Sequence, residues 1–120
     1  MNKKTLVIGA SLNPKRYSHQ AILSLQKRKY EIYAIGKSCG HILHTEINIK
    51  AIDYQQIHTV TLYLNPNHQP DYYTYIISLK PQRVIFNPGS ENPGFEALLT
   101  KNGIKSLRAC TLVLLSTGQY

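Results

Sequence analysis

The chain has 120 residues, of which 42% are hydrophobic and 17% charged, and its formal net charge is +8. This length suits one domain and the composition is that of a globular protein, while no apolar run reaches the roughly 18 residues that a membrane span needs. The positive charge favours an anionic partner, without deciding between a phosphorylated small molecule, a nucleic acid and a membrane.

The N-terminal apolar block, residues 5–8, is too short for a signal peptide and no cleavage pattern follows it. We therefore expect a cytoplasmic protein with no membrane partner. The two cysteines, Cys39 and Cys110, are expected to be free thiols, because disulfides are rare in that compartment.

The first predicted elements are a strand and a helix. Residues 5–8 are apolar without alternation and end at Gly9, as expected for a strand in the middle of a parallel sheet. Apolar residues at helical spacing then predict a helix over 17–28. Either Ser18 or Asn13 is expected to be its N-cap.

The next segment begins regularly and then becomes irregular. A second strand is predicted over 30–35 and is closed by Gly36. Residues 37–58 show weaker periodicity, with a short strand expected near 44–46 and a helical turn near 52–54.

The second half of the chain returns to a clear alternation. Strands are predicted at 59–64, 83–87 and 104–107, a helix at 69–79, and another helix that begins at Pro93 after the N-cap Asn92. Residues 111–115 are apolar, and periodicity leaves both a strand and a short helix open there.

Strands that alternate with helices indicate βαβ units and a parallel sheet. We predict a single domain over residues 1–120 with a Rossmann-like α/β fold, a three-layer sandwich whose five-stranded, mainly parallel sheet has helices on both faces. Ligands of such folds bind beyond the carboxyl ends of the strands. The loops that follow the first four strands are therefore the first candidates for a site.

The loop after the first strand has the residue types of a phosphate site. Gly9, Ala10 and Ser11 offer a tight turn, backbone N–H groups and a hydroxyl just before a helix N-terminus. Lys15 and Arg16 add positive charge. The alternative is an ordinary turn with solvated bases.

This loop is not the dinucleotide fingerprint G-x-G-x-x-G, because Ser11 and Pro14 stand where glycines are expected. The second strand ends in Gly36 and Lys37, without the acid that holds the ribose hydroxyls of NAD. That ending disfavours NAD and tolerates a phosphorylated ribose, as in NADP or coenzyme A, although Lys37 is equally well explained as a surface lysine.

Two other strand ends are candidates for lining the same crevice. Asn65 and Pro66 follow the third strand, and Asn87, Pro88 and Gly89 follow the fourth. The same residue types favour simple turns, so both interpretations stay open.

Further candidates are less specific. Tyr17, Ser18 and His19 open the first helix beside the phosphate loop, and Cys110 is expected near the end of the fifth strand. His19 faces either the ligand or solvent. Cys110 either approaches the pocket or is a buried, inert thiol, and the second is the commoner case.

Catalytic and metal-binding signals are weak. Cys39, His41 and His44 match no standard zinc spacing, so we interpret them as loop residues and expect no metal. No Ser/His/Asp set, paired carboxylate or activated cysteine stands out, so no catalytic residue is assigned. A binding module is favoured over an enzyme.

Several of these motifs together resemble the CoA-binding domain family of small stand-alone Rossmann-like proteins. The family's Gly-Ala-Ser followed by Arg-x-Ser-x is similar to residues 9–19, its Pro-Gly-x-x-Asn to residues 88–92, and its late Cys to Cys110. The resemblance covers nearly the whole chain. It departs at residues 35–37, where the family typically has Val-Asn-Pro, and at Asn65, where the family often has Arg.

The resemblance implies that the bound ligand is coenzyme A. The diphosphate would lie on the first loop near Arg16, and the nucleotide would extend toward Lys37 and Asn65. Related domains in acyl-CoA synthetases and succinyl-CoA ligase work with other domains. The residues expected to contact the ligand are Gly9, Ala10, Ser11, Lys15, Arg16, Tyr17, Ser18, His19, Gly36, Lys37, Asn65, Pro66, Asn87, Pro88, Gly89 and Cys110.

Three functions are compatible with these features. The first is binding of CoA or an acyl-CoA without catalysis. The second is a small NADP-linked oxidoreductase or another nucleotide-binding enzyme. The third is nucleic-acid binding, which the charge and nine tyrosines suggest but which we rank last, because the tyrosines mostly occupy core-like positions. A homodimer is compatible with all three.

Overall fold

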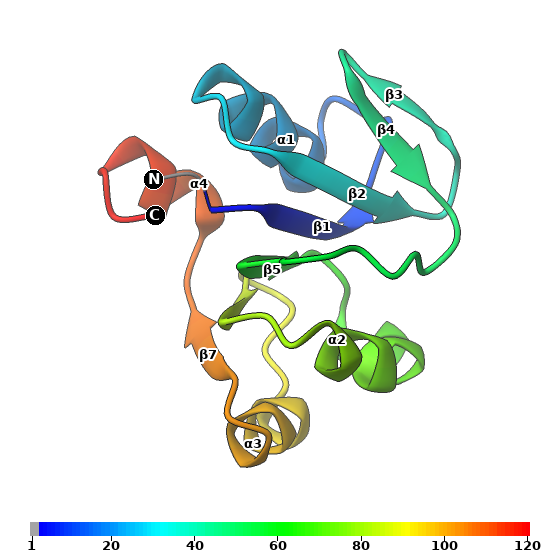
Figure 1. The fold of residues 1–120 in the computed structure, drawn as a ribbon. Coiled ribbons are helices and arrows are strands. Elements are labelled where there is room, and N and C mark those ends of the chain that lie inside the picture. Colours follow the sequence, from blue (N-terminus) through cyan, green and yellow to red (C-terminus); the bar gives the residue numbers. More distant parts are fainter. Residues whose placement is uncertain (1–2) are drawn as a thin grey trace.

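The computed structural model describes residues 3–120 and has a Rossmann-like α/β fold (Figure 1). Its strands are β1 (Thr5–Ala10), β2 (Ile32–Gly36), β3 (Gly40–Ile42), β4 (Thr45–Asn48), β5 (Thr59–Leu62), β6 (Arg83–Phe86) and β7 (Lys105–Arg108). Its helices are α1 (Tyr17–Lys27), α2 (Tyr73–Leu79), α3 (Pro93–Lys101) and α4 (Thr111–Ser116), with 3₁₀ turns η1 (Pro66–His68) and η2 (Pro70–Tyr72).

The strands form one sheet in the order β3-β4-β2-β1-β5-β6-β7. All pairs are parallel except β3 with β4. The chain moves outward in one direction from β1 through β2 to β4, and in the other direction from β5 to β7. The order therefore reverses between β1 and β5, which is where open α/β sheets place their ligands.

Helices cover both faces of the sheet (Figure 1). Leu6 and Ile8 of β1 face the core that α2 and α3 share, whereas Val7 faces the core under α1 and α4. All three side chains are fully buried. This explains why the central strands are continuous apolar runs rather than alternating ones.

The prediction of five strands is wrong, because the sheet has seven strands and is mixed. The short strand expected near 44–46 is β4, which pairs in parallel with β2. The missed strand, β3, has only three residues and pairs antiparallel with β4. Such a short hairpin has too little periodicity to be recognised before its pairing partner is known.

Two local predictions in the first half are also wrong. The N-cap of α1 is Arg16, rather than Ser18 or Asn13. No helical turn forms at residues 52–54. Instead the N–H of Tyr54 donates to the carbonyl of Ile52 at 2.8 Å, which closes a three-residue turn.

In the second half, the predicted helix over 69–79 is shorter, because two proline-started 3₁₀ turns come before α2. Asn92 caps α3 as predicted, with its side-chain oxygen accepting from the N–H of Phe95 at 3.1 Å. Residues 111–115, left open between strand and helix, belong to α4. Both cysteines are free, as expected. Among residues 3–120, no helix is long and apolar enough to span a bilayer.

Candidate functional site

A cleft of about 730 Å³ lies at the carboxyl ends of β1, β2 and β5, at the reversal of strand order. The loops after β1, β2, β5 and β6 all contribute to its walls. Eleven of the predicted site residues line it, namely Gly9, Ala10, Ser11, Arg16, Tyr17, Ser18, Gly36, Lys37, Asn65, Pro88 and Gly89. Because these loops all lie at the carboxyl ends of parallel strands, the cleft brings together residues from four separate stretches of sequence.

Gly9 allows the first loop to pass against the end of β5. Its φ is +94°, and a Cβ atom at this position would lie 2.7 Å from the carbonyl oxygen of Tyr63. The N–H of Tyr63 donates to the carbonyl of Ile8 at 2.8 Å. Because the two backbones are this close, any side chain at Gly9 would push the loop out of place.

The first loop is held by its own short hydrogen bonds. The hydroxyl of Ser11 accepts from the N–H of Asn13 at 3.1 Å, and the Asn13 side-chain oxygen accepts from the N–H of Lys15 at 3.0 Å. The N–H of Arg16 donates to the carbonyl of Asn13 at 3.0 Å. These turns leave the start of α1 facing the cleft.

The ring of His19 fixes the same loop from the side of the helix. Its Nδ1 lies 2.9 Å from the carbonyl oxygen of Ser11, and because a carbonyl only accepts, Nδ1 is the protonated nitrogen. His19 is half-buried and does not line the cleft. In the structure, His19 therefore positions the loop.

The N-terminus of α1 has the features of an anion site. Within the described residues, no side chain caps this helix, and its first turn contains no acid. Ser18 is only 3% exposed, lines the cleft, and its hydroxyl makes no hydrogen bond to any residue in the 3–120 range. Free N–H groups, the helix dipole and an unpartnered hydroxyl thus converge on one place.

The charges at the start of α1 have the opposite sign to those that helix N-termini usually favour. Helix N-termini favour acids, and α3 follows that rule with Glu96 in its first turn. In contrast, α1 has the basic residue Arg16 as its N-cap, and Lys15 precedes it. Cations at a positive helix end raise the local potential, which disfavours the helix but favours a bound anion.

The end of β2 supplies the next wall of the cleft. Gly36 is required by packing, because a Cβ atom there would overlap the carbonyl oxygen of Ala10. Lys37 and Ser38 follow, and both line the cleft. No carboxylate stands at this position, so the ribose contact typical of NAD sites has no counterpart in this loop.

The segment after β5 forms the opposite wall with Tyr63, Leu64, Asn65, His68, Asp71 and Tyr72. Asp71 is the one carboxylate among the lining residues. Burial raises the pKa of the Tyr63 phenol far above its usual range, so this phenol stays neutral. The Asn65 side-chain oxygen accepts from the N–H of Asn67 at 2.7 Å, which starts η1.

Asn87 is buried beneath the cleft. Its side-chain nitrogen donates to the Thr61 hydroxyl at 2.7 Å and the Leu62 carbonyl at 2.9 Å. Its side-chain oxygen accepts from the N–H of Thr111 at 2.8 Å. Asn87 therefore joins β5, β6 and α4, and its side-chain amide is engaged within the core.

The structure places five of the predicted site residues outside the cleft lining. These are Lys15, His19, Pro66, Asn87 and Cys110. Pro66 begins η1, and Cys110 is the half-buried N-cap of α4. Asn87 was a candidate because it ends a strand, but its side chain points into the core.

Nine lining residues were not predicted. They are Leu12, Asn13, Ser38, Tyr63, Leu64, His68, Asp71, Tyr72 and Ser90. Most directly follow a strand end that the sequence had already located, so extending each candidate loop by a few residues would have found them. His68, Asp71 and Tyr72 depend on the 3₁₀ turns, which periodicity did not reveal. In the described part of the chain, no three His, Cys, Asp or Glu side chains gather as metal ligands.

The model of the CoA-binding domain family matches residues 3–116. The chain belongs to the CoA-binding domain family. This confirms the resemblance drawn from the motifs of the first loop, of residues 88–92 and of Cys110. No curated protein matches the sequence at a significant level.

Solved structures give the family fold over the whole chain. A crystal structure of a protein described as uncharacterized shares 42% identity, covers 100% of this chain over 99% of its own length, and has a TM-score of 0.97. A Thermus thermophilus protein shares 20% identity over 99% of this chain and 91% of its own, with a TM-score of 0.86.

A larger protein contains a similar domain. An acetyl-coenzyme A synthetase of Candidatus Korarchaeum cryptofilum shares 13% identity, and its structure is described as a complex with phosphate and ADP. The match covers 88% of this chain and 25% of the synthetase chain, with a TM-score of 0.74. At this identity the similarity concerns the fold alone.

Proposed function

We propose that this protein binds coenzyme A or an acyl-CoA in the cleft and that residues 1–120 act as one binding domain. The observation that carries the proposal is the start of α1, which no side chain caps, together with Arg16 and the Ser18 hydroxyl, which lines the cleft and has no hydrogen-bond partner within residues 3–120. A diphosphate would satisfy the helix N–H groups, the hydroxyl and the positive charge together. Family membership supplies the identity of the ligand.

Lys37 supports the choice of CoA over NAD. It lines the cleft at the end of β2, where an acid would otherwise hold ribose hydroxyls. The 3′-phosphate of CoA carries negative charge that a lysine attracts. The pantetheine arm would then extend along the opposite wall toward Leu64 and Tyr72, which offer apolar surface.

The lining residues favour binding without chemistry. Asp71 is their one carboxylate and has no second carboxylate beside it, and Cys110 lies outside the cleft. A small NADP-linked oxidoreductase is the second candidate, because Lys37 would accept a phosphorylated ribose equally well. The missing second and third glycines of the first loop count against it.

The test is calorimetric titration with CoA of the full chain and of the Arg16→Ala variant. We expect Arg16→Ala to weaken CoA binding roughly tenfold, because it removes a hydrogen bond from a charged donor to a phosphate. Arg28→Ala is the matched control, since Arg28 is also exposed but follows the far end of α1. Equal losses in the two variants, or no heat with CoA at millimolar concentration, would contradict the proposal.

Two further ligands separate the alternatives. Dephospho-CoA lacks the 3′-phosphate, so it should bind more weakly to the wild-type chain and equally to wild type and Lys37→Ala. NADPH should fail to displace CoA. Incubation with acetyl-CoA should release no thiol above the buffer rate, and release that follows protein concentration would show an enzyme instead.

A further inference from the structure

The net charge of the molecule is concentrated at the end of the sheet opposite the cleft. Parallel strands begin at this end, and α1, α2 and α3 end there. Of the 14 Lys and Arg residues, nine lie at these strand starts and helix ends, together with one acid, Glu31, of the six in the chain. This basic end consists of Lys3, Lys4, Lys27, Arg28, Lys29, Lys80, Arg83, Lys101 and Lys105.

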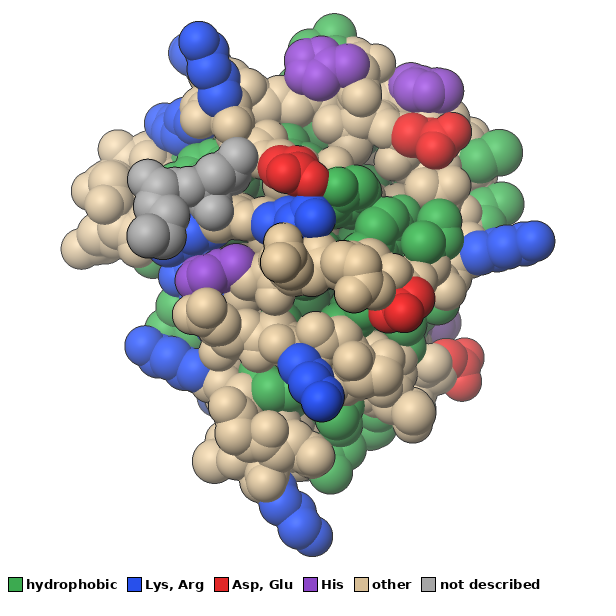
Figure 2. Space-filling model, viewed as in Figure 1, with side chains coloured by type: hydrophobic (Ala, Val, Ile, Leu, Met, Phe, Trp, Pro, Cys, Tyr) green, Lys and Arg blue, Asp and Glu red, His purple; other side chains and the backbone are tan. Residues whose placement is uncertain are grey.

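The whole excess of positive over negative side-chain charge lies at the basic end. Nine bases and one acid give +8 there, which equals the net charge of the chain. The remaining five bases and five acids cancel. Figure 2 shows much of the same separation, with most Lys and Arg side chains in the left and lower parts of the view, one at the right edge, and the acids mostly on the right.

Helix dipoles explain only part of this arrangement. Cations are favoured at helix C-termini, which accounts for Lys27 and Lys101 and for their neighbours. Lys3, Arg83 and Lys105 instead begin or precede strands, where no such dipole acts. The register aligns them, because Arg83 pairs with Lys105 on one side and with Thr59, the partner of Thr5, on the other.

Most of these charges are available to a partner. Lys27, Arg28, Lys29, Lys80, Lys101 and Lys105 are exposed, and none of the six forms an ion pair with a described residue. Glu31 pairs with Lys4 at 3.5 Å. The basic end therefore presents at least six cations without counter-charges from the described chain.

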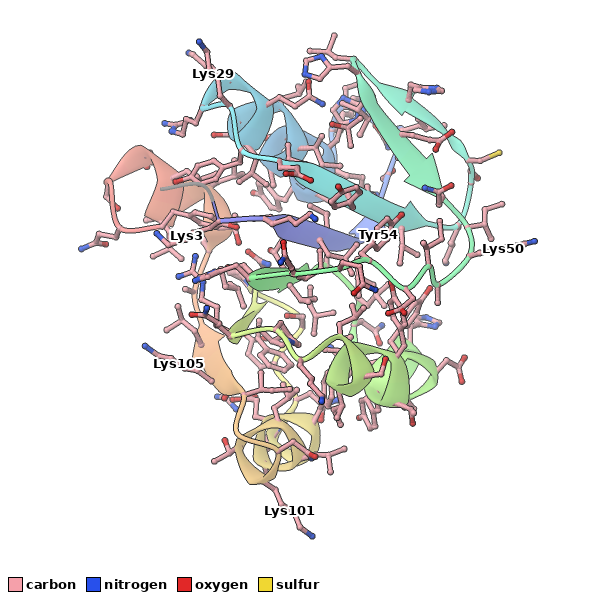
Figure 3. The ribbon with its side chains drawn as sticks, in the orientation of Figure 1. Lys3, Lys29, Lys50, Tyr54, Lys101 and Lys105 are labelled. Carbon is pink, nitrogen blue, oxygen red and sulfur yellow. The ribbon has the colours of Figure 1, made fainter. Side chains whose placement is uncertain are left out.

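The shape and composition of the basic end indicate the kind of anion. Its strand starts and helix ends expose no large apolar side chain among the described residues, whereas specific protein interfaces have an apolar centre depleted in charge. The cations of the basic end also point in different directions. In Figure 3, Lys29 points to the upper left, Lys105 to the left and Lys101 downward. A flexible polyanion can follow such a surface, but a flat bilayer cannot contact all of it.

We propose that the basic end binds single-stranded nucleic acid through its phosphates, without preference for sequence. Phosphate contacts from lysine and arginine release counterions and need no base recognition. The surface lies at the opposite end of the strands from the cleft, so both sites can be occupied together. The proposal does not depend on CoA binding.

The test is fluorescence anisotropy of labelled mixed-sequence RNA and DNA oligonucleotides over a salt series. We expect binding at low salt that weakens steeply as salt rises. The Lys101→Gln/Lys105→Gln variant should bind roughly tenfold more weakly at low salt, and each lost contact should lower the slope of log affinity against log salt by about 0.7. Urea unfolding of this variant should match that of the wild type, which shows that it is folded.

Lys50→Gln is the matched control, because Lys50 is exposed but lies on the right in Figure 3, beyond the end of β4. It should bind the oligonucleotides like the wild type. An equal loss with Lys50→Gln would show a general effect of net charge and overturn the proposal. So would absence of binding at low salt, or binding to phosphatidylserine vesicles that depends on Lys101 and Lys105 while oligonucleotides do not bind.

Discussion

Single residues of the cleft owe their identity to different physical demands. Gly9 is required because its φ is positive and the backbone of Tyr63 occupies the space of a side chain. Gly103 also has a positive φ, of +76°, but nothing lies within 4 Å of its missing Cβ atom. Substitutions at these two glycines can therefore distinguish the cost of a left-handed backbone from the cost of steric overlap.

Gly9→Ala should destabilise the protein more than Gly103→Ala. A left-handed conformation costs a non-glycine residue about 1–2 kcal/mol, and both variants share this cost. Only Gly9→Ala adds the overlap with Tyr63 and displaces the loop after β1. Urea unfolding should show the difference in stability, and CoA titration should show a loss of affinity in Gly9→Ala alone. Equal effects on both measurements would contradict this account of Gly9.

At the scale of elements, α1 both offers its N-terminus to the cleft and holds the loop that precedes it. The connection is the hydrogen bond of 2.9 Å between His19 and the carbonyl of Ser11. The helix and the loop are adjacent in sequence, but their relative position depends on this side chain. His19 thus positions the loop, and it does not line the cleft.

His19→Ala should weaken CoA binding several-fold and change stability by only about 0.5–1.5 kcal/mol, the net value of one hydrogen bond. His19→Asn should restore most of the affinity, because its amide nitrogen stands close to the position of the imidazole Nδ1. Calorimetry and urea unfolding measure the two effects. If Asn does not rescue binding, the loop does not depend on this hydrogen bond.

At the scale of the whole molecule, the concentration of positive charge also affects the protonation of a histidine at the basic end. His58 is half-buried there, and its Nδ1 lies 2.7 Å from the hydroxyl of Thr59. Burial, together with the charges of Arg83 and Lys3, lowers the pKa of His58 below its usual value of 6.5. The folded protein therefore favours the neutral ring.

This shift predicts a loss of stability as the pH falls below about 6.5. The unfolded chain binds a proton at His58 in that range while the folded chain does not, so protonation favours unfolding. His58→Gln should remove this part of the pH dependence, whereas His44→Gln, at an exposed position of the β3–β4 turn, should retain it. Urea unfolding at pH 7.5 and pH 5.5 measures the difference. Identical pH dependence in wild type and His58→Gln would contradict the prediction.

Local sequence was sufficient to predict the alternation of strands and helices, the Asn92 cap and the loops that carry most of the cleft. These features depend on neighbouring residues: apolar runs, turn formers and cap side chains act within a few positions of themselves. For the same reason Gly9, Ser11 and Arg16 were recognisable as candidates before any strand was paired.

The features that join distant residues depend instead on tertiary contacts. The β3–β4 hairpin exists because β4 pairs with β2, and Asn87 turns inward because Thr61 and Thr111 supply its hydrogen-bond partners. The basic residues appear spread along the sequence, but parallel pairing brings the starts of the parallel strands to one end of the sheet. That end carries the net charge, and the opposite end carries the cleft.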